Sequence, residues 1–346
     1  MKLLVIGDVH WSTYSSIVRG RGPYFSTRLE GLIASMQFVE RIADEYGCDE
    51  EIFLGDFFDK PDLNAEEISA LSEIEWSTHP RIRHFVVGNH ESGIATLEYN
   101  STKALQFKNN VIEDTPLLYP LDEKTELLFL PYITEDNRKP LTDYLAGRNP
   151  NKKLIVFSHN DIKDFQMGMF LSKTGFSISE IEDNCDLYVN GHLHNGSWVT
   201  KKILNLGNLS GQNFSEDSLK YEHHICIIDT DTGDIKFIEN PEAMNFYKLE
   251  INNAKDLKQL DYLKPHAVLS IKCVRSLEQQ VRDIVATKDV VTYKVIIARE
   301  LNETVVENVK TFDCADHLSQ FFKYVASLDD LEDPDIIKQE LVEVCK

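Results

Sequence analysis

Long apolar runs are absent from this sequence. No stretch approaches the ~18 apolar residues that a membrane-spanning helix needs. The N-terminal run from Leu3 to Ile6 is too short for the apolar region of a secretory signal, and Gly7-Asp8 interrupts it where a cleavage site would lie. We therefore expect a first β-strand there, no membrane contact, and a cytoplasmic protein.

Clustered cysteines are missing as well. The six cysteines lie far apart along the chain and form no CxxC pair. Disulfide frameworks and cysteine zinc sites need close, regular spacing. We expect reduced thiols that serve mainly structural roles.

Basic residues are scarce. The chain has 36 Lys and Arg against 57 Asp and Glu, which gives a formal net charge of −21. A protein that binds nucleic acid alone usually presents a basic face, because phosphate contacts dominate its affinity. The charge therefore favours a small substrate, or else bound metal ions and a partner protein that supply the positive field.

The rest of the composition is that of a folded protein. Hydrophobic residues make up 42% and charged residues 27% of the 346 residues, which is ordinary for a globular chain and suggests about two domains. Over the first ~240 residues, short apolar runs alternate with helical patterns, which predicts an α/β fold. The runs are Leu3 to Ile6, Ile52 to Leu54, Phe85 to Val87, Leu127 to Leu130, Leu154 to Phe157 and Leu187 to Val189.

One helix is clear from its periodicity. Between the first two runs, apolar residues recur every three or four positions from Leu29 to Ala43, which predicts a helix of about twenty residues. Ser26 or Thr27 can cap its start. Further on, Ile225 to Asp229 and Ile235 to Glu239 are expected to form a hairpin.

The last third of the chain has a different organisation. The pattern from Tyr247 to Arg299 predicts a strand, a helix, a strand, a helix and a strand. The segment from Ala315 to Lys346 has two amphipathic helical patterns. We predict an α/β core over 1–243, a small α/β domain over 244–312 and a helical tail over 313–346.

Polar motifs follow five of the apolar runs. They are Asp8-x-His10, Gly55-Asp56, Gly88-Asn89-His90-Glu91, His159 and Gly191-His192-x-His194. Sites in open α/β sheets form at the carboxyl ends of the strands, so one sheet edge could gather all five.

These motifs have the chemistry of a two-metal site. Two neighbouring divalent ions need a bridging carboxylate with further neutral and anionic ligands. The donors here are oxygens and nitrogens without a thiolate, which suits manganese, iron or zinc. Each motif alone is weak, but five unrelated loops are a poor explanation for the whole ordered set.

The motif set resembles that of the calcineurin-like metallophosphoesterases. The resemblance implies a four-layer α/β core, with two mixed β-sheets flanked by helices, and two divalent metal ions. By this resemblance, Asp8, His10 and His194 hold one ion, while Asn89, His159 and His192 hold the other. Asp56 bridges the two ions. His90 and Glu91 are the catalytic residues: His90 stabilises the transition state or protonates the leaving oxygen, and Glu91 supports His90.

Within that superfamily, the chain resembles the SbcD-type nuclease subunit of double-strand-break repair, in its compact phage form. Gly55-Asp56-Phe57-Phe58-Asp59 fits that family's second motif, and Ile203 to Leu209 followed by Phe214 to Asp217 resembles the segment after its last motif. Two positions depart from it: Gly207-Asn208-Leu209 replaces the usual Gly-Ser-Pro or Gly-Thr-Pro, and Glu91 stands where Asp is common.

This narrower resemblance implies a Mn²⁺-dependent DNA exonuclease and endonuclease that works with an SbcC-type coiled-coil ATPase in recombination and repair. A homodimer within a heterotetramer is implied, in the host cytoplasm if the chain is phage-encoded. The small domain would be a capping domain that seats DNA. The tail would dock on the ATPase, or else pack on its own core.

Other readings stay open. The enzyme could be a phosphatase or phosphodiesterase that acts on small molecules or phosphoproteins, or the fold could be a metal-stabilised scaffold without activity. Asp161 could orient His159 or simply form a turn, and Asp59 is expected to shape its loop. Local cations such as Arg19, Arg21, Lys201 and Lys202 could contact phosphates. The glycine-rich stretch 19–22 could equally be a mobile substrate loop or a solvated surface loop.

Overall fold

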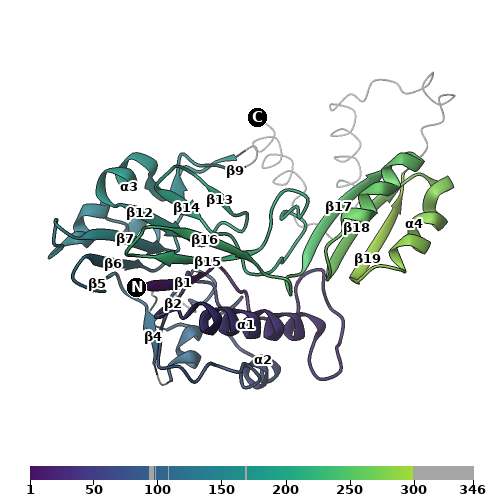
Figure 1. Cartoon of the computed structure of the whole chain (residues 1–346). Coiled ribbons are helices and arrows are strands. Elements are labelled where there is room, and N and C mark those ends of the chain that lie inside the picture. The colour runs from purple at the N-terminus through teal and green to yellow at the C-terminus, as the bar shows by residue number, and fades with distance from the viewer. Residues whose placement is uncertain (93–96, 98, 108, 168–169, 299–346) are drawn as a thin grey trace, which may run out of the picture. The chain divides into compact units, whose positions relative to one another are not determined.

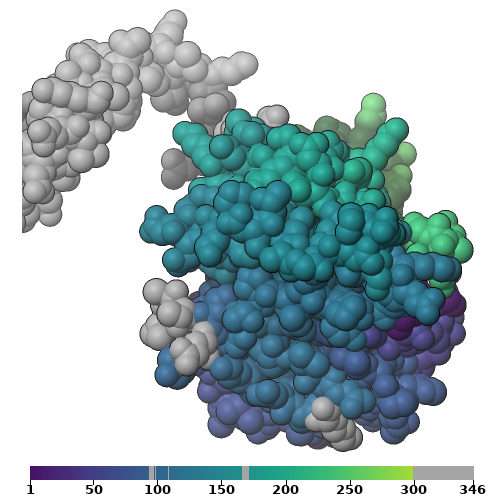
Figure 2. Space-filling model, turned by 90° about the vertical axis from the view of Figure 1, so that its left-hand side faces the viewer, coloured from purple at the N-terminus to yellow at the C-terminus, as the bar shows by residue number. Residues whose placement is uncertain are grey.

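The computed structural model describes residues 1–92, 97, 99–107, 109–167 and 170–298. In this part of the chain two six-stranded sheets stack on each other, and helices cover their outer faces (Figure 1). The expected four-layer α/β core is confirmed. Figure 2 shows one end of the core, where the blue and teal segments lie directly against each other.

The first sheet has the order β16-β15-β1-β2-β3-β4. Strands β1 to β4 are parallel, and β15 runs antiparallel to β1. The strands are β1 (Lys2–Ile6), β2 (Glu50–Phe53), β3 (Ile82–Val86), β4 (Asn110–Glu113), β15 (His224–Asp229) and β16 (Ile235–Glu239). The last two form the expected hairpin, and its turn places Gly233 at a φ of 83°.

The second sheet has the order β13-β14-β12-β7-β6-β5. Its four inner strands are parallel, and both edge strands are antiparallel to their neighbours. The strands are β5 (Leu117–Pro120), β6 (Thr125–Leu130), β7 (Lys153–Ser158), β12 (Leu187–Asn190), β13 (Ser197–Trp198) and β14 (Ile203–Asn205). Two short pairs lie outside it: β8 (Ile162–Lys163) with β11 (Phe176–Ser177), and β9 (Gln166–Met167) with β10 (Phe170–Leu171).

Alternation along the strands builds the layers. In β1, Leu3 and Val5 join the apolar core between the two sheets, while Leu4 and Ile6 join the core beneath the helix α1 (Thr27–Tyr46). Successive side chains of a strand point to opposite faces, so a strand buried on both faces is apolar throughout. This explains why β1 reads as a continuous apolar run.

Helix α1 matches the expected helix, and Ser26 is its N-cap, since its side chain accepts a hydrogen bond from the Leu29 backbone N–H. The other α-helices of the core are α2 (Ala65–Leu71) and α3 (Ile178–Asn184), both with capping boxes. Short 3₁₀ helices complete the layers: η1 (Ser101–Leu105), η2 (Glu135–Asn137) and η3 (Leu141–Leu145). Among the described helices, none has both the length and the apolarity to cross a bilayer.

A small parallel sheet follows the core. It has the order β17 (Asn245–Ile251), β18 (Ala267–Cys273) and β19 (Val290–Ile297), with its own apolar cluster. The connections are η4 (Ala254–Tyr262), then η5 (Arg275–Leu277) with α4 (Glu278–Val285). The expected strand and helix order is therefore present. The boundaries at 243 and 312 stay predictions, and residues 299–312 and the tail 313–346 lie outside the described residues.

The described cysteines carry no disulfide. Cys48, Cys185, Cys226 and Cys273 are buried and free. Burial raises the pKa of the Cys48 thiol to about 11, so it is protonated at neutral pH. These four fit the expectation of structural thiols, and Cys314 and Cys345 lie outside the described residues.

Candidate metal centre

The five sequence motifs meet where the carboxyl ends of two sheets face each other. Strands β1, β2 and β3 belong to the first sheet, whereas β7 and β12 belong to the second. The expectation that a single sheet edge gathers the motifs is therefore wrong. Parallel strands in both stacked sheets bring their carboxyl ends to a shared rim, and that rim carries the polar side chains.

Three of the predicted ligands have an unusual backbone. His10, Asp56 and His192 have φ values of 50°, 48° and 70°, in the left-handed region. Residues other than glycine rarely adopt this conformation, which costs on the order of 1–3 kcal/mol each and concentrates at functional sites. The turn at each of these strand exits therefore directs a polar side chain into the rim at a conformational cost.

Two motif glycines leave the space that the ligands occupy. A Cβ on Gly55, whose φ is 104°, would lie 2.4 Å from Nδ1 of His159. A Cβ on Gly88 would lie 2.1 Å from Oδ1 of Asp56. Both distances are far inside van der Waals contact, so a side chain at either position would displace a predicted ligand.

Asp8, His10 and His194 form the first donor cluster. The Nε2 atoms of His10 and His194 lie 2.9 Å apart, and each lies 3.9 Å from Oδ2 of Asp8. Two imidazole nitrogens facing each other beside a carboxylate form a set of lone pairs that suits a divalent cation. The residues present fit a metal ion here.

Asp56, His159 and His192 form the second cluster. Nε2 of His159 lies 3.1 Å from Oδ2 of Asp56 and 3.1 Å from Oδ1 of Asn89. Asp56 also belongs to a cluster with His10 and His90. A carboxylate shared between clusters is what a bridging ligand requires, although the division of the seven ligands between two ions stays a prediction.

Four of the clustered histidines have one ring nitrogen close to an oxygen atom of the protein. The pairs are His10 Nδ1 with Asp59 Oδ1 at 3.1 Å, His159 Nδ1 with the Leu54 carbonyl at 2.8 Å, His192 Nε2 with Asp161 Oδ1 at 3.2 Å, and His194 Nδ1 with Glu216 Oε1 at 2.7 Å. For His159 and His194 the contact is a hydrogen bond, which is the usual environment of a metal-binding histidine, whose second nitrogen donates to an oxygen. The carboxylates beside His10 and His192 lie at ion-pair distance.

Two of these partners change the sequence interpretation. Asp161 contacts His192, so the interpretation that it orients His159 is wrong. Glu216 received no role from the sequence, because it lies 22 residues beyond His194 and no local pattern joins them. The only signal was the resemblance over Phe214 to Asp217.

Attraction between the carboxylates and the histidines of the rim shifts the pKa values of both. Burial alone would lower the pKa of His159, but the carboxylates of Asp56 and Asp8 raise it to about 10. Burial would likewise raise the pKa of Asp56, yet the neighbouring His159 holds it well below its usual range. The field that attracts a proton to His159 is the field that attracts a cation.

The two predicted catalytic residues lie in different surroundings. The side chain of His90 is 41% exposed, and its Nδ1 lies 2.9 Å from the carbonyl oxygen of Asp59. Glu91 is fully buried, and its two oxygens accept the backbone N–H groups of Phe58 and Gly88 at 3.2 and 2.7 Å. Glu91 thus joins the second and third motif loops. The catalytic roles of both residues stay predictions.

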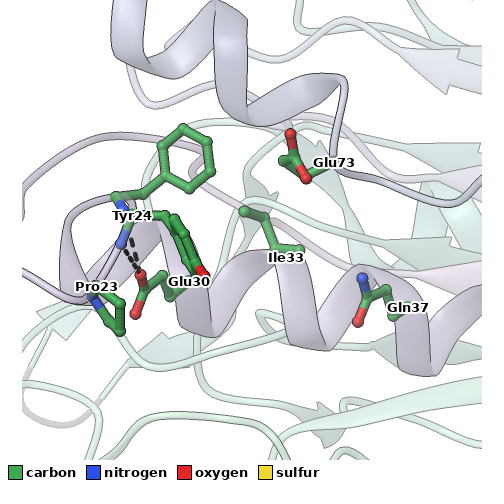
Figure 3. Close-up of a pocket in the computed structure, with 7 residues that line it drawn as sticks. Pro23, Tyr24, Glu30, Ile33, Gln37 and Glu73 are labelled. Atoms are coloured by element: carbon green, nitrogen blue, oxygen red, sulfur yellow. Dashed lines mark hydrogen bonds between the residues drawn. The ribbon is translucent and has the colours of Figure 1, made fainter.

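Some cations expected to contact phosphate are held by the protein. Arg21 forms an ion pair of 2.6 Å with Glu66, and Lys202 donates to the carbonyl groups of Glu182 and Cys185 at the end of α3. The loop of Arg21 is also held by Glu30, whose carboxylate accepts two backbone N–H groups beside a pocket of about 510 Å³ (Figure 3). Arg21 and Lys202 therefore have structural contacts.

The solved structures to which this chain is similar are distant. A dimetal phosphatase from Danio rerio is 10% identical with a TM-score of 0.38, over 66% of this chain and 91% of that one. The phosphoesterase Yfce from E. coli is 15% identical with a TM-score of 0.33, over 69% and 100%. The calcineurin-like phosphoesterase YfkN from Bacillus subtilis is 10% identical with a TM-score of 0.36, over 69% and 88%.

No curated protein sequence is significantly similar to this chain. Residues 1–196 match the calcineurin-like phosphoesterase family, which is more than half of the 346 residues. The match covers all five motifs, and members of the family use a dinuclear divalent metal centre. The chain belongs to the calcineurin-like phosphoesterase family and is a metal-dependent phosphoester hydrolase.

Proposed function

We propose that this chain is a Mn²⁺-dependent DNA nuclease, an exonuclease and endonuclease of the SbcD type that acts with an SbcC-type ATPase. The observation that carries the proposal is the attachment of the small sheet to the loop 207–218, which follows the last ligand motif. The small sheet is thereby fixed to a loop beside the donor clusters and adds a surface there. Such an added surface suits a long substrate better than a small phosphate ester.

The attachment uses both backbone and side chains. Gly211 N–H donates to the Met244 carbonyl at 3.0 Å, and Ser218 N–H donates to the Phe246 carbonyl at 3.0 Å. Phe246 N–H donates in return to Ser218 Oγ at 2.8 Å, and the rings of Phe214 and Phe246 lie 5.4 Å apart. These contacts support a capping role for the small sheet at the metal centre.

The proposed hydrolysis needs two bound metal ions and a proton donor for the leaving oxygen. Two divalent ions in this donor set would offset the charge that develops on the phosphoryl oxygens and activate water as the nucleophile. His90 keeps a proton on Nδ1 through the Asp59 carbonyl oxygen, and Asp56 Oδ1 accepts its backbone N–H at 2.9 Å. When its ring is protonated, Nε2 can donate a proton to the leaving oxygen.

The test compares substrates on one preparation. We expect the purified full-length chain with Mn²⁺ to shorten end-labelled linear DNA and to open a DNA hairpin, and to turn over p-nitrophenyl phosphate far more slowly. The Asp56→Asn variant is the control for a contaminating nuclease. Turnover of the phosphomonoester without DNA cleavage, even with an ATPase partner present, would contradict the proposal and favour a phosphatase.

The ATPase partner is the second part of the proposal. A net charge of −21 is unfavourable for DNA binding by this chain alone, so a partner would supply most of the affinity. The proposed docking segment is 313–346, where Leu318, Phe321, Phe322 and Val325 have helical spacing. Co-purification of a coiled-coil ATPase with the full chain, and its loss after truncation at residue 312, is the expected result. Equal recovery with both chains would exclude this segment.

A further inference from the structure

Glu216 has the surroundings of a functional carboxylate, although it lies outside every motif. It is on the loop between β14 and β15, and only 2% of its surface is exposed. One oxygen, Oε1, accepts from His194 Nδ1 at 2.7 Å and from Asn213 Nδ2 at 3.2 Å. The other, Oε2, accepts from Asn208 Nδ2 at 3.0 Å and from Gln212 N–H at 2.7 Å.

We infer that Glu216 is the positioning residue for His194 at the first donor cluster. Its carboxylate accepts the Nδ1 proton, so the ring carries its lone pair on Nε2, the nitrogen that faces His10. An ionised acceptor also raises the electron density of the imidazole and fixes the plane of the ring. Glu216 would therefore set both the orientation and the donor strength of one ligand.

The four donors make the carboxylate hard to replace. A buried carboxylate is unfavourable unless hydrogen bonds satisfy both of its oxygens. Here the donors on Oε2 come from Glu216's own loop, so the acid is held before any ion binds. A glutamine could still accept from His194 through one oxygen, but its NH₂ group would then face the donors of Asn208 and Gln212.

The neighbouring acid is a natural control. Asp217 lies beside Glu216 in the sequence, but its Oδ2 pairs with Lys220 at 3.3 Å near the surface, and its Oδ1 accepts the Leu219 backbone N–H at 3.1 Å. Replacing Asp217 by Asn removes the same charge one residue away and leaves the contact with His194 in place. Any effect of loop charge alone would appear equally in both variants.

The inference is tested with Mn²⁺ alone, by calorimetric titration of the full chain and by electron paramagnetic resonance of the bound ions. We expect Glu216→Gln to weaken one of two Mn²⁺ sites ~10-fold and Glu216→Ala ~100-fold, and the coupled two-ion signal to give way to a single-ion signal at limiting Mn²⁺. Asp217→Asn should bind both ions as the wild type does. If Glu216→Ala does not fold, Glu216→Gln carries the test.

Two results would overturn the inference. One is unchanged affinity for both ions in Glu216→Gln; the other is equal weakening of both sites, which a general loss of structure would produce. The inference also rests on His194 being a ligand, as the proposed function requires. His194→Ala should lose one ion: if it still binds two, the ligand assignment fails, whereas loss there with normal binding in Glu216→Gln refutes only the role of Glu216.

Discussion

At the residue scale, the candidate metal centre depends on two glycines, which have no side chain, as much as on the ligand side chains. Gly88 and Gly55 approach Asp56 and His159 so closely that a Cβ would overlap them. The sequence shows these glycines beside the ligands. It does not show that the glycine of the third motif makes room for the acid of the second.

The first prediction concerns that approach. Gly88→Ala would place a methyl group 2.1 Å from Oδ1 of Asp56 and so move the carboxylate that both clusters share. We expect activity to fall by ~100-fold or more, since a displacement of about 1 Å at a reacting centre has this effect. Steady-state hydrolysis of a phosphodiester and Mn²⁺ content per chain measure it.

Gly47→Ala is the control for this change. Gly47 ends α1 at a φ of 60°, with nothing within 4 Å of a Cβ. Its substitution should cost about 1 kcal/mol of stability and leave metal binding unchanged. Normal activity and two bound ions in Gly88→Ala would show that Asp56 tolerates the displacement.

A buried histidine away from the metal centre gives a second prediction. Nδ1 of His84 lies 2.7 Å from Glu113 and its Nε2 lies 3.3 Å from Glu50, which itself accepts from the Tyr119 hydroxyl. Burial alone would lower the pKa of His84, but the two carboxylates raise it above the usual value. The protonated ring therefore stabilises the folded state.

The sign follows from linkage. Because the folded pKa lies above the unfolded value of about 6.5, the contribution is complete below that pH and is lost as pH rises through the folded pKa. Urea unfolding from pH 6 to 9 should show that the stability advantage of the wild type over His84→Gln shrinks as pH rises. A constant or growing advantage would contradict a charged His84.

At the element scale, the sequence predicts individual strands and helices well. The hairpin strand Ile235–Glu239 has the predicted bounds. Helix α1 begins after the predicted cap and has 20 residues, as expected, although it continues to Tyr46, beyond the last periodic apolar residue Ala43. What the sequence does not predict is which sheet each strand joins, because that choice depends on contacts between distant segments. The sequence therefore suggests that the five strands that precede the motifs share one sheet, whereas they belong to two different sheets.

The same limit applies to the partners of the ligands. Asp59 lies within the second motif, where the sequence predicts a loop residue, whereas Glu216 reaches His194 from a later loop. The left-handed backbone conformation of His10, Asp56 and His192 is also not predictable from the sequence, because none of these residue types requires it. Non-local geometry, rather than propensity, accounts for what the sequence did not predict.

The cap of α1 gives a prediction at this scale. The sequence offered Ser26 or Thr27, and the structure has Ser26 accepting the Leu29 N–H at 3.2 Å. Ser26→Ala should lower the free energy of unfolding by about 1 kcal/mol, the usual cost of a lost N-cap. Thr27→Ala should change it by less than about half of that. Equal losses in the two variants, measured by chemical denaturation, would refute the assignment of the cap.

At the scale of the whole molecule, charge is the feature that any DNA-directed account must explain. The chain carries a net charge of −21, and two of its expected phosphate contacts, Arg21 and Lys202, are held by Glu66 and by α3. Of the four cations named as phosphate contacts, Arg19 and Lys201 are then left to release counterions from DNA. A strong dependence of binding on salt would require many such contacts.

We therefore predict weak DNA binding by the isolated chain with a shallow dependence on salt. The slope of log affinity against log salt should correspond to about one or two phosphate contacts, and it should steepen when the ATPase is added. Fluorescence anisotropy with labelled DNA and Ca²⁺, so that little cleavage occurs, measures both slopes. A steep slope for the chain alone would mean that its own surface binds DNA.

The central claim is that the clustered side chains hold two ions while His90 acts on the reacting group. The most direct test measures Mn²⁺ content and hydrolysis of bis(p-nitrophenyl) phosphate on the same preparations of wild type and His90→Ala. We predict two ions per chain in both proteins and a rate ~10²–10⁴-fold lower in the variant, the usual contribution of a general acid. A wild type with one ion or none, or a variant as active as the wild type, would contradict the account.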